Sequence, residues 1–247
     1  MSKFTSEEKK YHDEVAGDYA KTRYGDFIWE IPERWFILQP QYFIGKKVID
    51  MGCGPAVSVK KAFGSDFGRE VSYTGVDISK KMINEAKKTI PGGTFRVHGF
   101  SGLGIKKSSM DTVMALGALH HAEDQRATLR EWCDMVKPGG QLLMREPLYF
   151  ALRRGTGASP NEEGIQTSLV DAVLGEKHFT MYLKVYFCSK FLHLVNRINN
   201  KCIPTLWKRY GVLWTLPYVI DMLLCNTLGH LLPWFRGEAV IIIAKKI

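Results

Sequence analysis

The chain has 247 residues, of which 45% are hydrophobic and 24% charged, and its formal net charge is +9. These values exclude a disordered or fibrous chain and are ordinary for a globular domain with a sizeable core. The five cysteines are scattered without a C-x-x-C pair, which argues against a structural zinc site and a disulfide framework. The polar first residues lack the apolar segment of a secretory signal, so we expect a cytoplasmic location.

The chain begins with two predicted helices, at residues 5–24 and 31–44. An apolar strand follows at 47–51, and Ser79 is the expected N-cap of a later helix that ends near Thr89. Further elements alternate along the chain, with helices at 56–64 and 124–136 and strands at 72–77, 94–98, 110–115, 141–145 and 239–244. Strands that alternate with helices in this way indicate a parallel sheet covered by helices.

The most specific motif joins the first two strands. The first strand ends in the turn DMGCG at residues 50–54, and the second ends in Asp77, which is followed by Ile78. Gly52 and Gly54 let the backbone approach a ligand, and we expect their N–H groups to point towards it. A carboxylate at a strand end matches the two hydroxyls of a ribose. The absence of a third glycine and of a Lys-Ser/Thr pair argues against a dinucleotide fold and a P-loop.

Later motifs follow in a characteristic order: DTVM at 111–114, ALHH at 118–121 and VKPGG at 136–140. Together with the turn and Asp77, they resemble class I S-adenosylmethionine (SAM) methyltransferases of the small-molecule and lipid branch, which includes ubiquinone-, menaquinone- and sterol-type enzymes. The resemblance covers about residues 10–147 and the final strand. It implies SAM as the cofactor and an α/β, Rossmann-like, mostly parallel seven-stranded sheet with helices on both faces.

The resemblance also implies a division of a single domain over residues 1–247. An N-terminal helical lid would span 1–45, the SAM-binding core 46–147, a helical substrate cap 148–237, and the final strand 238–247.

Several residues are implied to contact SAM. Asp50 would hold the methionine end, and Tyr19 would reach the cofactor from the N-terminal helix. Where the family usually has Gly-Asp-Ala, this chain has Gly-Phe-Ser at 99–101, so Phe100 would stack on the adenine instead of accepting its hydrogen bond. The full set of implied contacts is Tyr19, Asp50, Gly52, Cys53, Gly54, Asp77, Ile78, Phe100, Ser101 and Leu116. For Cys53, the simplest interpretation is a small turn residue.

Catalytic candidates follow the fourth and fifth strands. His120 or His121 could remove a proton from the acceptor as the methyl group arrives, and Glu146 is a rival for this role. A structural role for His120 in the loop is the alternative. The sequence contains no set of residues with metal-ligand spacing, so no metal is expected.

The region before the last strand should select the acceptor. From His178 to Arg236 it holds seven Lys or Arg residues and one acid, Asp221, and it is strongly apolar over 211–235. It could form a buried cap over an apolar pocket, or touch a membrane surface through 197–235, where Arg197, Lys201, Lys208 and Arg209 would meet anionic head groups. Both interpretations imply a small hydrophobic or lipid-like acceptor.

Two other functions use the same features. The basic and aromatic residues could bind RNA in an RNA methyltransferase, but no recognised RNA module accompanies them, so nucleic acid is not favoured. A non-catalytic partner subunit with the SAM fold is the other alternative, against which the intact glycines and Asp77 count. The acceptor atom and the oligomeric state are not predicted.

Overall fold

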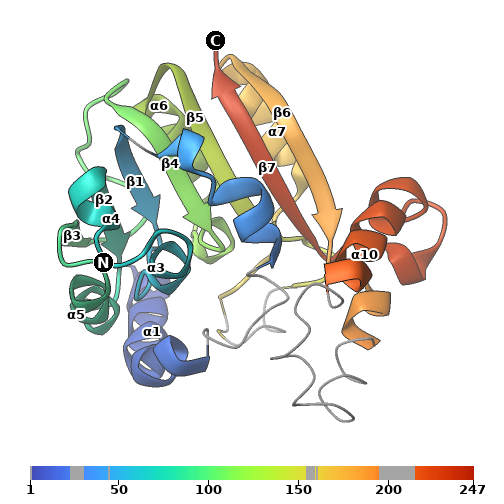
Figure 1. Ribbon diagram of the computed structural model, residues 1–247, viewed down its shortest axis with the longest axis horizontal. Helices are drawn as coiled ribbons and strands as arrows, with labels where there is room; N and C mark the ends of the chain where they lie inside the picture. Colours follow the sequence, from blue (N-terminus) through green and yellow to red (C-terminus); the bar gives the residue numbers. More distant parts are fainter. Residues whose placement is uncertain (1, 23–30, 44, 154–158, 160, 195–214) are drawn as a thin grey trace. The chain divides into compact units, whose positions relative to one another are not determined.

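The computed structural model describes residues 2–22, 31–43, 45–153, 159, 161–194 and 215–247 (Figure 1). It divides into two compact units. The first contains residues 1–183 and 241–247, and the second contains residues 184–240.

A seven-stranded sheet contains every strand of the described chain. Its order is β3-β2-β1-β4-β5-β7-β6. The bounds are β1 (Lys47–Met51), β2 (Ser72–Asp77), β3 (Thr94–Val97), β4 (Met110–Leu116), β5 (Val136–Pro147), β6 (Phe179–Phe187) and β7 (Ala239–Lys246). Strand β1 pairs in parallel with β2 and β4, so the strand order reverses between β1 and β4. Ligands of open α/β sheets bind beyond the carboxyl ends of the strands at such a switch point.

The helices α3 (Val57–Phe63), α4 (Phe67–Glu70), α5 (Lys80–Thr89) and α6 (Gln125–Met135) connect these strands. Helix α5 packs against β2 and β3, and α6 packs against β4 and β5. The predicted N-cap is confirmed, because the Ser79 hydroxyl accepts the N–H of Met82 at 3.1 Å. Asp124 caps α6 in the same way by accepting the N–H of Ala127 at 2.9 Å.

The N-terminal segment forms helix α1 (Lys3–Thr22), which packs against α5. Asp13 fixes this contact by accepting a 2.6 Å hydrogen bond from the Ser79 hydroxyl. The single helix predicted over 31–44 is wrong, since a short π-helix η2 (Glu33–Ile37) and a 3-10 turn η3 (Pro40–Tyr42) occupy this stretch. Glu33 of η2 forms a buried 2.9 Å ion pair with Arg145 of β5, which favours this local geometry over a regular helix.

The predicted extent of the helical cap also needs correction. Residues 148–237 include helix α7 (Thr167–Glu176), which packs on α6, and strand β6, which belongs to the main sheet. The sequence of β6 has Phe, Met, Leu, Val and Phe at every second position, which is typical of a strand, so this pattern could have signalled β6 within the aromatic segment. Strand β5 (Val136–Pro147) is also longer than the predicted strand at 141–145, because it includes the Pro-Gly-Gly segment that was expected to be a turn.

The second unit contains helix α10 (Thr215–Thr227) and the 3-10 turn η5 (Pro233–Phe235). Asp221 of α10 is fully buried and accepts the N–H groups of Cys188 and Ser189. Large apolar side chains are exposed on the same helix and after it: Leu216, Val219, Ile220, Leu223, Leu228, Leu231, Leu232 and Trp234. Among the described helices, none is long and apolar enough to cross a membrane.

Candidate cofactor and acceptor site

The glycine turn after β1 lies at the switch point and is tightly packed. Gly52 has φ +71°, and a Cβ at this position would lie 2.7 Å from the Ala118 Cβ and 3.3 Å from Phe100. The turn therefore requires glycine for both its backbone conformation and its space. The expectation that the glycine N–H groups face a ligand is not met here. The N–H of Gly52 donates to the Val76 carbonyl, and that of Gly54 donates to Asp77.

Asp77 ends β2 as predicted, and its carboxylate is nearly buried. One oxygen accepts the N–H of Gly54 at 3.0 Å and the other that of Ser79 at 2.9 Å. Each carboxylate oxygen has a second lone pair, so both remain able to accept a further hydrogen bond. Burial raises the pKa of Asp77, while the two backbone bonds and the nearby ring of His12 oppose that rise.

Asp50 lies at the end of β1, where Tyr73 donates a 2.7 Å hydrogen bond to it. Burial raises the pKa of Asp50 to about 7, against the effect of this bond. Asp50, Gly52, Gly54 and Leu116 line a small hollow of about 40 Å³. The Cys53 thiol is buried, and burial raises its pKa well above the usual range, which supports the structural interpretation of this residue.

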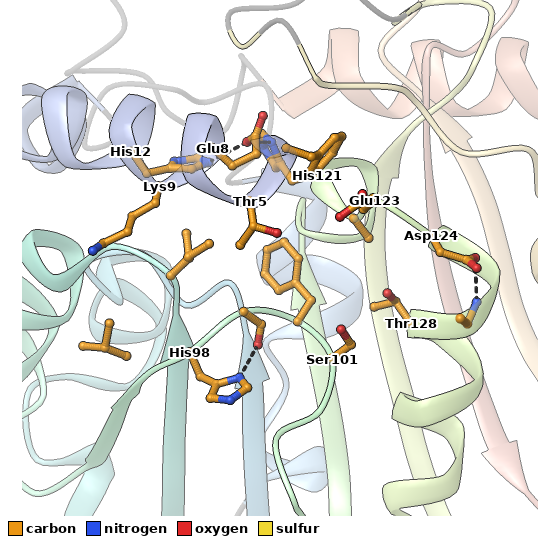
Figure 2. Close-up of a pocket in the computed structure, with 17 residues that line it drawn as sticks. Thr5, Glu8, Lys9, His12, His98, Ser101, His121, Glu123, Asp124 and Thr128 are labelled. Atoms are coloured by element: carbon orange, nitrogen blue, oxygen red, sulfur yellow. Dashed lines mark hydrogen bonds and ion pairs between the residues drawn. The ribbon is translucent and has the colours of Figure 1, made fainter. Parts of the chain in front are cut away.

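A cavity of about 640 Å³ is lined by residues that follow β2 and β3, by the loop after β4 and by helix α1 (Figure 2), whereas Asp50, Gly52, Gly54 and Asp77 are not among its lining residues. Three of the predicted cofactor contacts line it, namely Ile78, Phe100 and Ser101. Phe100 is fixed in place because its carbonyl accepts the indole N–H of Trp132 at 2.9 Å and its ring meets that indole edge-on. The cavity is within the size range of small-molecule sites. Its other side is formed by helix α1, which supplies residues that include Glu8 and His12.

The two histidines after β4 have different surroundings. His120 is buried, and its Nδ1 lies 2.8 Å from Glu146. Glu146 also accepts the backbone N–H groups of Ala118 and Leu119, at 3.0 and 2.8 Å. Burial would raise the pKa of Glu146, but these bonds and the His120 ring hold it below its usual range. Glu146 and His120 therefore hold the loop in place, and neither is among the residues that line the described cavity.

His121 lines the cavity and contacts helix α1 (Figure 2). Its Nδ1 lies 3.0 Å from Glu8, and its ring meets the ring of His12 edge-on at 4.9 Å between centroids. Burial and the neighbouring His120 ring lower the pKa of His121 to about 4, although Glu8 opposes this shift. The structure thus brings together three side chains that the sequence analysis did not connect. The sequence signal for this cluster is the spacing of Glu8 and His12, which lie one helical turn apart.

One predicted contact lies outside what the structure describes. Tyr19 belongs to the backbone of α1, but the position of its side chain is not described. Arg197, Lys201, Lys208 and Arg209 of the predicted membrane contact likewise fall outside the described residues.

The glycine turn, the acid that ends β2 and the loop after β4 surround one edge of a Rossmann-like sheet, which is the arrangement of class I SAM-dependent methyltransferases. Residues 49–144 match the family described as "Methyltransferase domain". This part of the chain is a class I SAM-dependent methyltransferase domain, as the sequence resemblance implied.

Two curated relatives and one solved structure illustrate the likeness. The chain is 29% identical over 117 residues to the ubiquinone biosynthesis O-methyltransferase of Xanthomonas euvesicatoria, covering 44% of this chain and 47% of that protein. It is 27% identical to the mitochondrial enzyme of the same name from Schizosaccharomyces pombe, covering 70% and 63%. Magnesium protoporphyrin IX methyltransferase of Synechocystis has the same fold, with a TM-score of 0.61, 16% identity and coverage of 99% and 100%. The matched parts are less than two thirds of both curated relatives.

The residues present fit SAM. The cradle at Gly52 admits no Cβ, and Asp77 offers two buried oxygens at a strand end, next to a cavity lined by Ile78 and Phe100. Asp77 would hold the ribose, Phe100 the adenine and Asp50 the methionine end. When bound, SAM supplies a methyl group that its sulfonium makes electrophilic. The chain itself must orient the acceptor towards that methyl group and exclude water.

Proposed function

We propose that this protein transfers the methyl group of SAM to a small hydrophobic or lipid-like acceptor. The observation that carries the proposal is the cavity of about 640 Å³, which has Ile78 and Phe100 on one side and helix α1 on the other. Such a cavity has room for a cofactor beside a compact acceptor. The names of the two curated relatives, which refer to ubiquinone biosynthesis, support an apolar acceptor.

The acceptor side of the cavity has the polar groups that a methyl transfer to oxygen or nitrogen needs. His121 is the one predicted catalytic residue that lines the cavity, and Glu8 fixes its ring. Glu146 acts as a positioning residue, because its bonds to the loop set the place of His121. We expect helix α1 to exclude water from this side as a lid, since Asp13 holds it against α5.

Incubation of the protein with methyl-labelled SAM and a fractionated lipid extract tests this function. We expect label in an apolar product and equal formation of S-adenosylhomocysteine. Glu146→Gln should lower the turnover number more than it changes SAM affinity, because it alters the loop and not the cofactor contacts. SAM binding without turnover on any fraction would favour the non-catalytic partner subunit, and labelled RNA would favour the RNA methyltransferase.

We also infer that the second unit touches a lipid surface. Eight large apolar side chains are exposed within residues 216–234, and Leu216, Val219 and Leu223 recur at helical spacing on α10. A soluble surface seldom exposes such a stripe without a partner. Lys190 and Arg236 lie in the same unit, and the surrounding sequence is strongly basic, which complements anionic head groups. A tryptophan at position 234, which is 59% exposed, suits the membrane interface.

Sedimentation with phosphatidylserine vesicles tests this contact. Burying two leucines is worth about 3 to 6 kcal/mol at most, so Leu216→Gln with Leu223→Gln should weaken binding at least about tenfold. Glutamine keeps a good helix propensity, which protects α10. Ile247→Gln is the matched control, since this exposed residue lies in the first unit. Failure of the unaltered protein to sediment, or equal binding by the double variant, would refute the contact.

A further inference from the structure

Three potential metal ligands converge on the wall of the cavity. Glu8 and His12 extend from helix α1 towards His121 of the loop after β4 (Figure 2). Glu8 Oε2 lies 3.5 Å from His12 Nε2 and 3.0 Å from His121 Nδ1. One ligand atom from each of the three residues lies within 4.8 Å of the other two. Ligand atoms that each lie about 2.1 Å from one ion are about 3 to 4 Å apart, which the two Glu8 distances match.

A second layer of polar groups holds two of these side chains. The other oxygen of Glu8 accepts a hydrogen bond from the Ser159 hydroxyl. The other ring nitrogen of His121, Nε2, lies 3.7 Å from Glu162. A histidine that binds a metal typically has its second nitrogen engaged by a carboxylate, which fixes the ring. The arrangement of His121 between Glu8 and Glu162 follows this rule.

Burial makes the cluster more than a set of surface charges. The side chains of Glu8, His12 and His121 are only 4, 19 and 9% exposed. Burial would raise the pKa of Glu8, but hydrogen bonds from the two histidines and Ser159 hold it well below its usual range.

We propose that Glu8, His12 and His121 bind one divalent transition-metal ion of the Zn²⁺ class. Two imidazoles and one carboxylate are a common donor set of zinc sites that keep an open coordination position. Because all three residues line the cavity, that position faces the cavity, where an oxygen of the acceptor would occupy it. His121 is then a ligand, and the ion takes over the polarisation of the acceptor. The site would also tie α1 to the loop after β4.

The inference stands apart from the proposed methyl transfer, because metal binding is measurable without SAM or acceptor. Untagged protein, stripped with a chelator, is titrated with Co²⁺ and then with competing Zn²⁺. We expect visible absorption bands of low-symmetry Co²⁺ at one ion per chain, and their loss on addition of Zn²⁺.

Variants assign the ligands. His12→Ala and Glu8→Gln should each weaken Zn²⁺ binding at least about 100-fold, and Glu162→Gln should weaken it about tenfold through the outer layer. His98→Ala is the matched control, since His98 lines the same cavity but bonds to Gly99 away from the cluster. Thermal melts without metal establish whether each variant folds. If either His12→Ala or Glu8→Gln does not fold, the Zn²⁺ affinity of the other variant tests the ligand assignment.

Two results would overturn the proposal. The first is the absence of Co²⁺ bands in the unaltered protein, which would leave the cluster as a hydrogen-bonded lock for α1. The second is binding that His12→Ala and Glu8→Gln leave unchanged while His98→Ala weakens it. If chelator-stripped protein still transfers methyl groups, the metal ion has no role in binding the acceptor, while the proposed methyl transfer stands.

Discussion

Gly52→Ala tests whether the turn after β1 needs glycine for space as well as for conformation. An alanine at φ +71° costs about 1 to 2 kcal/mol from the left-handed conformation alone. Its Cβ would lie 2.7 Å from the Ala118 Cβ, which forces a shift that costs about 1 to 3 kcal/mol more. We therefore expect the free energy of unfolding to fall by about 2 to 5 kcal/mol. The same Cβ would lie 3.3 Å from Phe100, the proposed adenine contact, so SAM affinity should fall at least about tenfold, or 1.4 kcal/mol.

Gly139→Ala is the matched control for this experiment. Gly139 has φ +76°, but nothing lies within 4 Å of a Cβ built there, and it is at the opposite end of β5 from the site. The free energy of unfolding of this variant should fall only by the conformational cost of about 1 to 2 kcal/mol, and its SAM affinity should be unchanged. Urea unfolding and calorimetric SAM titration measure both quantities. Equal stability of the two variants together with unchanged SAM affinity in Gly52→Ala would refute the reasoning.

Two further predictions concern buried charges. Burial next to Tyr73, Asp77 and Glu33 raises the pKa of the Asp50 carboxyl from 3.8 to about 7 in the folded protein. As the pH rises, the unfolded chain therefore loses this proton first, and the free energy of unfolding should decrease between pH 4 and 7. Three pKa units correspond to at most about 4 kcal/mol, and Asp50→Asn should remove this part of the pH dependence; parallel stability curves for the two proteins would contradict it. Glu33→Ala removes the carboxylate partner of the buried Arg145 and should cost about 3 to 5 kcal/mol in urea unfolding. Glu85→Ala, which breaks the exposed pair with Lys88, should cost less than about 1 kcal/mol, and equal losses would show that burial of the Glu33 pair is unimportant.

The sequence predicted the elements whose signals are local. The strand and turn that contain Asp50 and Gly52, and the N-cap at Ser79, need only a few neighbouring residues to be recognised. Strand β6 was missed although its apolar residues recur at every second position, because two of the intervening residues are tyrosines and the segment was interpreted as part of an aromatic cap. The helix predicted over 31–44 failed for another reason: the buried pair between Glu33 and Arg145 joins positions 112 residues apart.

The candidate site divides in the same way. Asp77 and Phe100 could be located from motifs that lie within one βαβ unit. The direction of the glycine N–H groups could not, since it depends on the Val76 carbonyl and the Asp77 carboxylate as acceptors. The spacing of Glu8 and His12 signals one half of the cluster, but the contact of Glu8 with His121 joins positions 113 residues apart and follows only from the fold.

The central claim is that this domain binds SAM at the edge where Asp77 ends β2. Calorimetric titration of the unaltered protein and Asp77→Ala with SAM tests it most directly. We expect saturable binding of one SAM per chain that Asp77→Ala abolishes, while a thermal melt shows that the variant is still folded. Near-native affinity in the folded variant would contradict the claim, and so would the absence of SAM binding to the unaltered protein.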